Sequence, residues 1–285
     1  CPNPECLSAL FRGRDEAICA GPQQHRFVVV NGYPRFAPDI DIGKYGSEYA
    51  QKYAFLWSFG YETLGIGLTE GLYRTTMSLA AEALPACEQD EPLVIDCGCG
   101  VGRVTADLAR LNRRARVIGI DASPSKLDLA KEILLQSGAV ERALPALGFP
   151  QRLRIAGRGL QNVSLAQADA FSMPIASGSA DLVVSQNLID RLGHDPERGF
   201  TLTDFLAEVR RVLRPGGHFV LLSPLNWELP AEWALYPTGA SIRSALQNNG
   251  FAVDVFFDQL LYRELLDARG SVEEFTTTVL AATAA

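Results

Sequence analysis

The sequence contains no apolar run long enough to cross a membrane. A membrane-spanning helix needs about 18 or more consecutive apolar residues, and no stretch of this chain reaches that length. The first residues also lack the basic segment followed by an apolar run that is typical of a secretion signal. We therefore expect a soluble, cytoplasmic protein that makes no contact with a membrane.

The chain also lacks a positive net charge. Its 26 lysine and arginine residues are outnumbered by 33 aspartate and glutamate residues, which gives a net charge of −7. Since RNA and DNA are attracted by basic surfaces, this balance disfavours a nucleic acid and favours a small-molecule substrate as the partner. Internal repeats and low-complexity tracts are absent, and the sequence leaves the oligomeric state open.

The length is that of one main domain with a small addition. With 285 residues, 47% of them hydrophobic, the chain can bury one substantial core and has room for a short appended module. Shifts in composition divide it into three predicted parts. They are a cysteine-containing module over residues 1–36, an aromatic-rich linker or cap over 37–67, and a main domain over 68–285.

Histidine is scarce, with three residues in the chain, and one of them follows a group of cysteines. Cys1, Cys6, Cys19 and His25 form the spacing C-x4-C-x12-C-x5-H in a region with too few apolar residues to fold unaided. A tetrahedral zinc ion bound by these four side chains would supply the missing folding energy. A disulfide is the competing account, although it suits secreted chains and would leave an odd cysteine.

Beyond this module, apolar strands alternate with amphipathic helices. Strands are predicted at 93–97, 116–120, 163–167, 181–185 and 217–223, and helices at 68–84, 102–111, 124–136 and 202–213. Pro215 and Gly216 are expected to end the last helix and turn the chain into its strand. The alternation predicts a doubly wound α/β fold with a mostly parallel sheet. In such a sheet, ligands bind beyond the carboxyl ends of the strands.

A glycine-rich turn connects the first of these strands to its helix. The segment from Leu93 to Arg103 reads LVIDCGCGVGR and contains Gly98, Gly100 and Gly102. Because glycine lets the backbone take positive φ and approach a ligand closely, we expect the peptide N–H groups of this turn to face a bound molecule. A dinucleotide fingerprint would need glycine at position 103, so that fingerprint is not satisfied.

A second carboxylate supports a cofactor site. Asp121 ends the next strand about 20 residues after the glycines, where the ribose hydroxyls of a nucleotide-like cofactor would need an acceptor. The competing account is that Asp96 and Asp121 merely end strands near helix N-termini, where negative charge is favoured.

Asp96 followed by this glycine turn resembles motif I of class I S-adenosylmethionine (SAM) methyltransferases. The resemblance implies that Asp96 lies near the amino acid half of SAM and that the turn packs against the cofactor. It also implies a seven-stranded sheet closed by an antiparallel pair over Leu246–Phe257 and Glu274–Ala282. Asp169, after the third strand, would contact the adenine amino group, with a plain helix cap as the alternative. Gln186, at the end of the fourth strand, would lie beside the methyl group.

Two segments carry a finer resemblance. Residues 187–192, NLIDRL, and the segment Leu222–Trp227 resemble the methyltransferase domain of ovothiol biosynthesis, which methylates an imidazole nitrogen of 5-thiohistidine. The resemblance implies a small polar substrate with a histidine-derived nitrogen. The chain departs from that family in having Pro-Leu-Asn-Trp at 224–227, where the family has Pro-Tyr-Thr-Trp, and in having no iron-dependent sulfoxide synthase module.

Methyl transfer requires mainly that the enzyme align two partners and exclude water. An imidazole or amine can lose its proton after the transfer, whereas a hydroxyl needs a base. The candidates beside the reacting atoms are Asn187, Asp190 and His194. A structural ion pair of Asp190 with Arg191 and a solvated loop position for His194 are the alternatives. The candidates for substrate binding are Trp227, Tyr262 and Glu264.

Three functions are compatible with these patterns. The first is a SAM-dependent methyltransferase acting on a small, amino-acid-like or heteroaromatic molecule. The second is an rRNA or tRNA methyltransferase, because the amino-terminal 40 residues resemble the zinc ribbons that precede some bacterial methyltransferase domains, including an rRNA guanine methyltransferase. The acidic composition disfavours it. The third is a SAM-binding protein that does not transfer methyl, since its cofactor turn would look the same.

Overall fold

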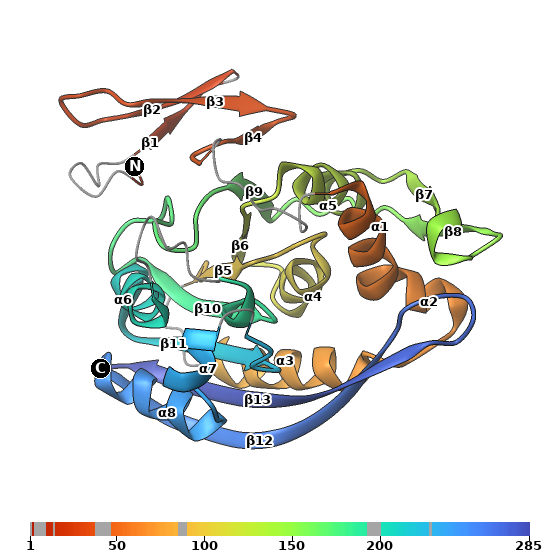
Figure 1. The fold of residues 1–285 in the computed structure, drawn as a ribbon. Helices are drawn as coiled ribbons and strands as arrows, with labels where there is room; N and C mark the ends of the chain where they lie inside the picture. Colours follow the sequence, from red (N-terminus) through yellow and green to blue (C-terminus); the bar gives the residue numbers. More distant parts are fainter. Residues whose placement is uncertain are drawn as a thin grey trace.

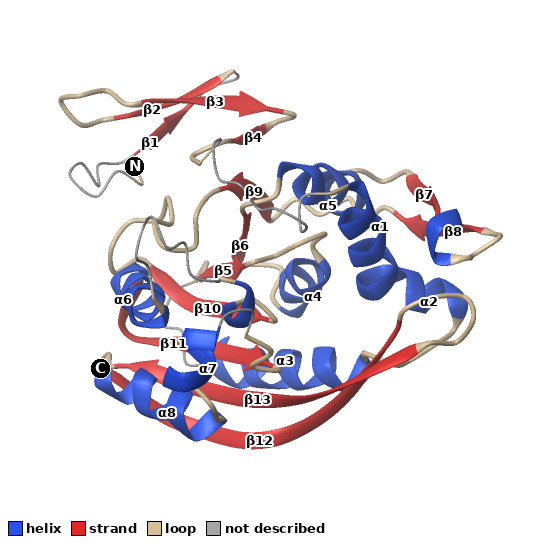
Figure 2. Cartoon of the chain, viewed as in Figure 1, coloured by secondary structure: helices blue, strands red, loops and turns tan. Residues whose placement is uncertain are grey.

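The computed structural model describes residues 2, 10–13, 15–37, 47–84, 90–192, 201–227 and 230–285. These residues form a large seven-stranded sheet, a four-stranded sheet at the amino terminus and a two-stranded hairpin (Figure 1). Figure 2 shows helices lying on both faces of the large sheet. No helix among the described residues is long and apolar enough to span a membrane.

The large sheet has the strand order β12-β13-β11-β10-β5-β6-β9. Neighbouring strands from β11 to β9 run parallel, and β12 and β13 are antiparallel. The parallel strands are β5 (Leu93–Cys97), β6 (Arg116–Asp121), β9 (Val163–Gln167), β10 (Ala180–Gln186) and β11 (Leu213–Ser223). The predicted doubly wound, mostly parallel seven-stranded sheet is confirmed.

Alternation along each strand divides the core into two layers. In β5, Val94 faces the layer that contains α3, α4 and α5, whereas Leu93 and Ile95 face the layer that contains α6 and α8. This period of two is expected for a strand that is covered on both sides. The helices are α3 (Glu70–Ala83), α4 (Arg103–Leu111), α5 (Pro124–Leu135), α6 (Leu202–Val212), α7 (Pro230–Leu235) and α8 (Gly239–Asn248).

Two predicted boundaries are wrong. Pro215 and Gly216 do not form a turn before the strand, because β11 begins at Leu213 and includes them. Leu246 lies in α8 and not in a closing strand. The closing strands β12 (Phe251–Leu265) and β13 (Val272–Ala284) are longer than predicted. Figure 1 shows them running past the sheet toward α2, where the Tyr61 hydroxyl donates to the Leu265 carbonyl at 2.7 Å. Tertiary contacts outside the sheet therefore extend this pair.

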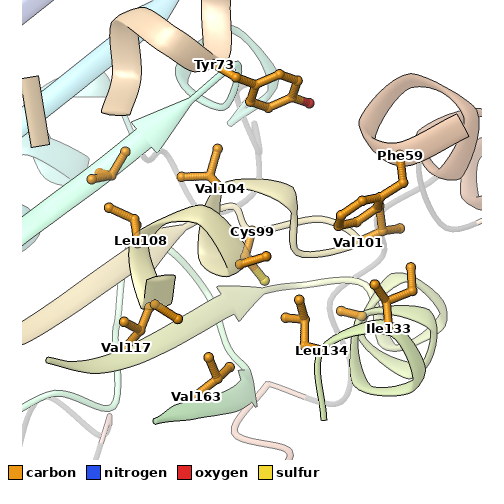
Figure 3. Close-up of a cluster of buried hydrophobic side chains, with 14 of the residues drawn as sticks. Phe59, Tyr73, Cys99, Val101, Val104, Leu108, Val117, Ile133, Leu134 and Val163 are labelled. Atoms are coloured by element: carbon orange, nitrogen blue, oxygen red, sulfur yellow. The ribbon is translucent and has the colours of Figure 1, made fainter. Parts of the chain in front are cut away.

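The aromatic-rich segment forms a helical cap before α3. It contains α1 (Glu48–Phe55), a π-helix (Leu56–Gly60) and α2 (Tyr61–Leu64). Phe55 and Phe59 are fully buried, and Figure 3 shows Phe59 next to Val101 of the glycine-rich turn. Tyr53 and Trp57 line a cavity instead. The aromatic residues are therefore divided between core and cavity.

The amino-terminal strands form a sheet of their own, in the order β1-β2-β3-β4. They are β1 (Leu10–Arg12), β2 (Glu16–Cys19), β3 (Arg26–Val30) and β4 (Tyr33–Pro34). After β4 the chain contacts the main domain, since the Phe36 N–H donates to the Gln167 carbonyl of β9 at 2.8 Å. The Tyr33 hydroxyl also donates to Asp128 of α5 at 2.9 Å. Between α5 and β9, residues 138–162 contain the hairpin β7 (Ala139–Ala143) and β8 (Arg152–Ala156).

Two glycines of the turn after β5 provide a matched test of packing. Both have positive φ, but a Cβ at Gly102 would lie 2.5 Å from Leu134 Cδ1, whereas a Cβ at Gly100 would meet no atom within 4 Å. We expect Gly102→Ala to lower the free energy of unfolding by about 2–5 kcal/mol, from backbone strain and overpacking against a buried leucine. Gly100→Ala should cost only the strain, about 1–2 kcal/mol. Urea unfolding measures both, and equal losses would contradict the packing argument.

Candidate functional site

A cavity of about 850 Å³ lies beyond the carboxyl ends of the parallel strands. It is lined by residues that end β5, β6 and β10, by the glycine-rich turn, by the cap and by the β12–β13 pair. Its volume is near the upper end of the range for small-molecule sites, about 300–1,000 Å³, which leaves room for a cofactor together with a small second molecule. The cavity lies where the sheet topology predicts a ligand.

The glycine-rich turn forms one wall of this cavity, but the N–H groups of Gly98, Cys99 and Gly100 are used within the protein. The N–H groups of Gly98 and Cys99 both donate to the Ile120 carbonyl, at 2.8 and 2.9 Å. The Gly100 N–H donates to Asp121 Oδ2 at 2.8 Å. The expectation that these N–H groups face a ligand is therefore wrong. Instead, Gly100 presents bare backbone to the cavity, because a Cβ there would project into open space.

Asp121 holds the turn and lines the cavity at the same time. Its Oδ2 accepts the Gly100 N–H and its Oδ1 accepts the Ser123 N–H, both at 2.8 Å. Each carboxylate oxygen has two lone pairs, so each can accept a further hydrogen bond from a ligand hydroxyl. This position and free capacity are what a ribose would need.

Asp96 lies deeper, at the end of β5. Its side chain is 2% exposed, and Thr105 Oγ1 donates to its Oδ2 at 2.5 Å. Burial raises the pKa of Asp96 to about 7, although the Thr105 hydrogen bond acts in the opposite direction. A cationic group bound beside Asp96 would stabilise its ionised form.

The remaining predicted cofactor residues are divided between the cavity and the core. Asp169 lines the cavity, and its Oδ1 accepts the Phe171 N–H at 3.0 Å. Gln186 also lines it, and its Oε1 accepts the Thr76 hydroxyl of α3 at 2.6 Å. Gly102 does not line the cavity, since it packs against Leu134.

Asn187, directly after β10, has two unusual features. Its φ is +53°, a left-handed conformation that is uncommon for a residue with a side chain. Its Nδ2 donates to the Tyr262 hydroxyl at 3.0 Å, whereas its buried Oδ1 has no hydrogen-bond partner within the described part of the chain. A buried amide oxygen without a partner is costly, and backbone strain is concentrated at functional sites. Asn187 therefore lines the cavity and has a buried, unsatisfied acceptor.

Asp190 is fully buried in the short 3-10 helix Ile189–Arg191. The Ser223 hydroxyl donates to its Oδ1 at 2.9 Å, and Arg191 Nε lies 3.5 Å from its Oδ2. Burial raises the pKa of Asp190, against the charge of Arg191 and the Ser223 hydrogen bond. Asp190 and Arg191 both line the cavity, so the ion pair that was the alternative role for Asp190 lies within the candidate site.

Glu264 of β12 is the acidic group at the far end of the cavity. Its side chain is buried, with the residue 7% exposed, and it accepts a hydrogen bond from the Tyr53 hydroxyl. The pKa of Glu264 is raised to about 7, mainly by burial. The negative charge of Glu273, the residue opposite it on β13, contributes to this rise. Tyr262 lies two residues earlier on the same face and stacks on Phe275, with ring centroids 5.1 Å apart.

Other predicted site residues lie elsewhere or outside the described residues. Trp227 does not line the cavity, because its ring packs against Tyr236 and its Nε1 donates to the Tyr236 carbonyl at 2.9 Å. His194 lies outside the described residues. Of the four predicted metal ligands, Cys1 and Cys6 also lie outside them. The other two come together, with Cys19 Sγ 3.5 Å from His25 Nδ1.

The aromatic-rich segment predicted as a linker or cap contributes Tyr53 and Trp57 to the cavity. Sequence reasoning missed Tyr73, Arg103, Glu273 and Phe275. For Glu273 and Phe275 a signal was available, because alternate residues of a strand share one face. It would have required the β12–β13 register, which pairs Glu264 with Glu273 and Tyr262 with Phe275.

The raised pKa of Glu264 predicts a stability that depends on pH. From its ordinary value of 4.5, this pKa rises to about 7 in the folded protein. The folded state therefore binds the proton more tightly, and stability falls as pH rises from about 4.5 to 7, by up to about 3 kcal/mol. Glutamine is neutral throughout, so Glu264→Gln should stabilise the ligand-free protein at pH 8 and leave stability unchanged at pH 4.

Denaturant unfolding at both pH values measures this difference. Glu274→Gln is the control, because Glu274 is the neighbouring residue on β13, is exposed and pairs with Arg263 at 2.7 Å. A Glu264→Gln variant that is no more stable than the wild type at pH 8 would contradict the assigned burial of charge.

Comparison with known proteins identifies the family. A family model described as a methyltransferase domain matches residues 89–250. The chain is 28% identical to ajmaline N-methyltransferase of Rauvolfia serpentina, over 70% of this chain and 60% of that protein. It is 27% identical to trans-aconitate 2-methyltransferase of Deinococcus radiodurans, over 70% of this chain and 67% of that protein.

Among solved structures, the chain is similar to magnesium protoporphyrin IX methyltransferase from Synechocystis PCC 6803 with bound SAM. The TM-score is 0.46 and the identity 16%, covering 84% of this chain and 98% of that one. The chain spans about a third to two thirds of the length of the curated relatives that it matches. Since the family model matches more than half of the chain, the chain belongs to the methyltransferase-domain family.

Proposed function

We propose that this protein is a SAM-dependent methyltransferase that methylates a nitrogen of a small polar molecule. The observation that carries the proposal is one cavity that is lined by Asp96, Gly100 and Asp121 and also by Asn187, whose buried Oδ1 lacks a partner among the described residues. A methyl donor and its acceptor would thus share one cavity, which allows the alignment that an in-line displacement requires.

The residues of the first part fit SAM. The cofactor carries hydrogen-bond donors on its amino acid, ribose and adenine portions, and this part of the cavity offers carboxylate acceptors. Asp121 would hold the ribose hydroxyls with its unused lone pairs, and Asp96 would face the ammonium group. Asp169 would accept from the adenine amino group. When bound, SAM supplies an activated methyl group on its sulfonium.

Asn187 is assigned the orienting role toward the methyl acceptor. Its Nδ2 donates a hydrogen bond to the Tyr262 hydroxyl at 3.0 Å. This bond restricts rotation of the amide group and therefore fixes the position of Oδ1. An N–H of the acceptor that donates to Oδ1 would place the nitrogen lone pair in a defined direction. Asp190, whose pKa is raised by burial, can accept a proton once the nitrogen has been methylated.

Within this class we propose a histidine-like substrate whose imidazole nitrogen is the acceptor. The segment 187–192, which carries the resemblance to the ovothiol methyltransferase domain, contributes Asn187, Asp190 and Arg191 to the cavity. Imidazole provides one N–H and one lone pair, which match an amide acceptor and a methyl donor on opposite sides. The names of two relatives, ajmaline N-methyltransferase and trans-aconitate 2-methyltransferase, also support a small acceptor.

The test uses SAM with a labelled methyl group. Wild-type protein is incubated with a panel of histidine, thiohistidine, simple amines, hydroxylated amino acids, carboxylic acids and total RNA. We expect label in an imidazole compound. Transfer only to RNA would identify the alternative RNA methyltransferase, and tight SAM binding without any transfer would identify a SAM-binding protein. Either result would overturn the proposal.

Asn187 has its own matched pair of variants. Asn187→Gly keeps access to the left-handed backbone and removes the amide, whereas Asn187→Ala removes the amide and adds strain. We expect both to lower kcat by about 100-fold through loss of orientation, with SAM affinity unchanged by calorimetry. A Gly variant with wild-type kcat would show that only the backbone conformation matters.

We also propose a structural zinc ion in the amino-terminal module. Zinc bonds of about 2.3 Å to sulfur and about 2.1 Å to nitrogen, at a tetrahedral angle, place the two ligand atoms about 3.6 Å apart. Cys19 Sγ and His25 Nδ1 lie 3.5 Å apart, and the backbone N–H of His25 donates to the same sulfur at 3.0 Å. Cys1 and Cys6 would complete the site. Among the described residues there is no group of three metal ligands.

Metal analysis of the purified protein tests the zinc proposal. We expect about one zinc per chain in the wild type, loss of that zinc in Cys19→Ser, and retention in Cys97→Ala, because Cys97 is buried in β5. A zinc-free wild type, or a Cys19→Ser variant with full zinc content, would refute it. A chain lighter by two hydrogens on mass spectrometry would indicate the competing disulfide.

A further inference from the structure

The far end of the cavity contains a buried carboxylate that forms no ion pair within the described part of the chain. Glu264 is 7% exposed, and its hydrogen bonds come from the neutral Tyr53 and Tyr262 hydroxyls. Arg191 acts on it only at longer range. Buried carboxylates are normally paired with a cation or a metal. A cationic group of a ligand would supply such a partner.

The walls around Glu264 are aromatic. Tyr53 and Trp57 of the cap line the cavity together with Tyr262 and Phe275 of the closing strands. Tyr262 and Phe275 are stacked on each other, with ring centroids 5.1 Å apart and an interplanar angle of 18°. Aromatic faces attract cations and also contact methyl and methylene groups. A carboxylate between such walls suits an ammonium group better than a metal ion, which would need several oxygen ligands.

The charges near this end favour a cation. Glu273 lies opposite Glu264 in the β12–β13 register, and both carboxylates line the cavity. Arg191, which acts on Glu264 only at longer range, is paired with the buried Asp190. The titratable groups that face Glu264 from the packed elements are Tyr53 of α1, Tyr61 of α2, Tyr73 of α3, Arg191, Tyr262 of β12 and Glu273 of β13.

We infer that Glu264 and its aromatic walls form a binding site for the ammonium group of the substrate, separate from the atom that Asn187 orients. The inference rests on the proposed function and narrows its substrate class to molecules that carry a positively charged amine besides the methyl acceptor. An amino acid or a diamine meets this description, whereas a tricarboxylic acid such as trans-aconitate does not. Glu264 and Asn187 would then bind two different groups of one molecule, because both side chains contact Tyr262.

Binding of a simple amine tests this site directly. Benzylamine and benzyl alcohol have nearly the same shape and differ in charge, and each is titrated by calorimetry into the full-length protein with S-adenosylhomocysteine present. We expect benzylamine to bind about tenfold more tightly than benzyl alcohol. Glu264→Gln should remove this preference, whereas Glu274→Gln, on the neighbouring exposed position, should keep it.

Proton release separates recognition from a structural role. A bound ammonium group favours ionised Glu264, so benzylamine binding near pH 7 should release protons, and the binding enthalpy should vary with the ionisation enthalpy of the buffer. The Glu264→Gln variant should show no such variation. Equal affinity for the amine and the alcohol, or a preference that survives Glu264→Gln, would overturn the inference.

The outcome for the proposed function is read separately. Affinity for S-adenosylhomocysteine is measured in the same titrations, before the amine is added. Cofactor binding without amine preference would overturn only the ammonium site. An amine preference without any cofactor binding would overturn the proposed function and leave the ammonium site in place.

Discussion

The structure depends on one bridging carboxylate. Asp121, at the end of β6, accepts N–H groups from Gly100 in the turn after β5 and from Ser123 before α5. It thereby fixes two loops that follow neighbouring strands, and it leaves lone pairs free on the cavity side. The turn can then expose bare backbone at Gly100 while its own N–H groups are satisfied. The position that we propose for the cofactor lies beside this bridge.

The cavity beside this bridge has three acidic side chains whose burial favours the protonated, neutral form. Asp96, Asp190 and Glu264 are buried, and burial raises the pKa of each. Such groups lower stability in the ligand-free protein, and a bound cation or hydrogen-bond donor would compensate for that cost. The strained backbone and unpaired Oδ1 of Asn187 belong to the same pattern. The site is therefore built for ligands that bring positive charge and N–H groups.

The cap and the closing strands complete the cavity from opposite ends of the chain. Tyr53 of α1 donates a hydrogen bond to Glu264 of β12, which lies more than 200 residues later in the sequence. The Tyr61 hydroxyl likewise donates to the carbonyl of Leu265. These contacts explain why β12 and β13 continue beyond the sheet, since the extended pair has the cap as a partner. The sequence pointed to each of these two segments, but the contacts between them are decided by the tertiary structure.

Local sequence by itself determined the central strands, the glycine-rich turn and the carboxylates Asp96 and Asp121, because apolar runs, glycine spacing and strand ends are local signals. The tertiary structure decided what those residues do. It turned the N–H groups of the turn inward, placed Gly102 against Leu134 and kept Trp227 out of the cavity. It also brought the cap tyrosines to Glu264. These outcomes depend on contacts between distant segments, whose free energies no local pattern of residues contains.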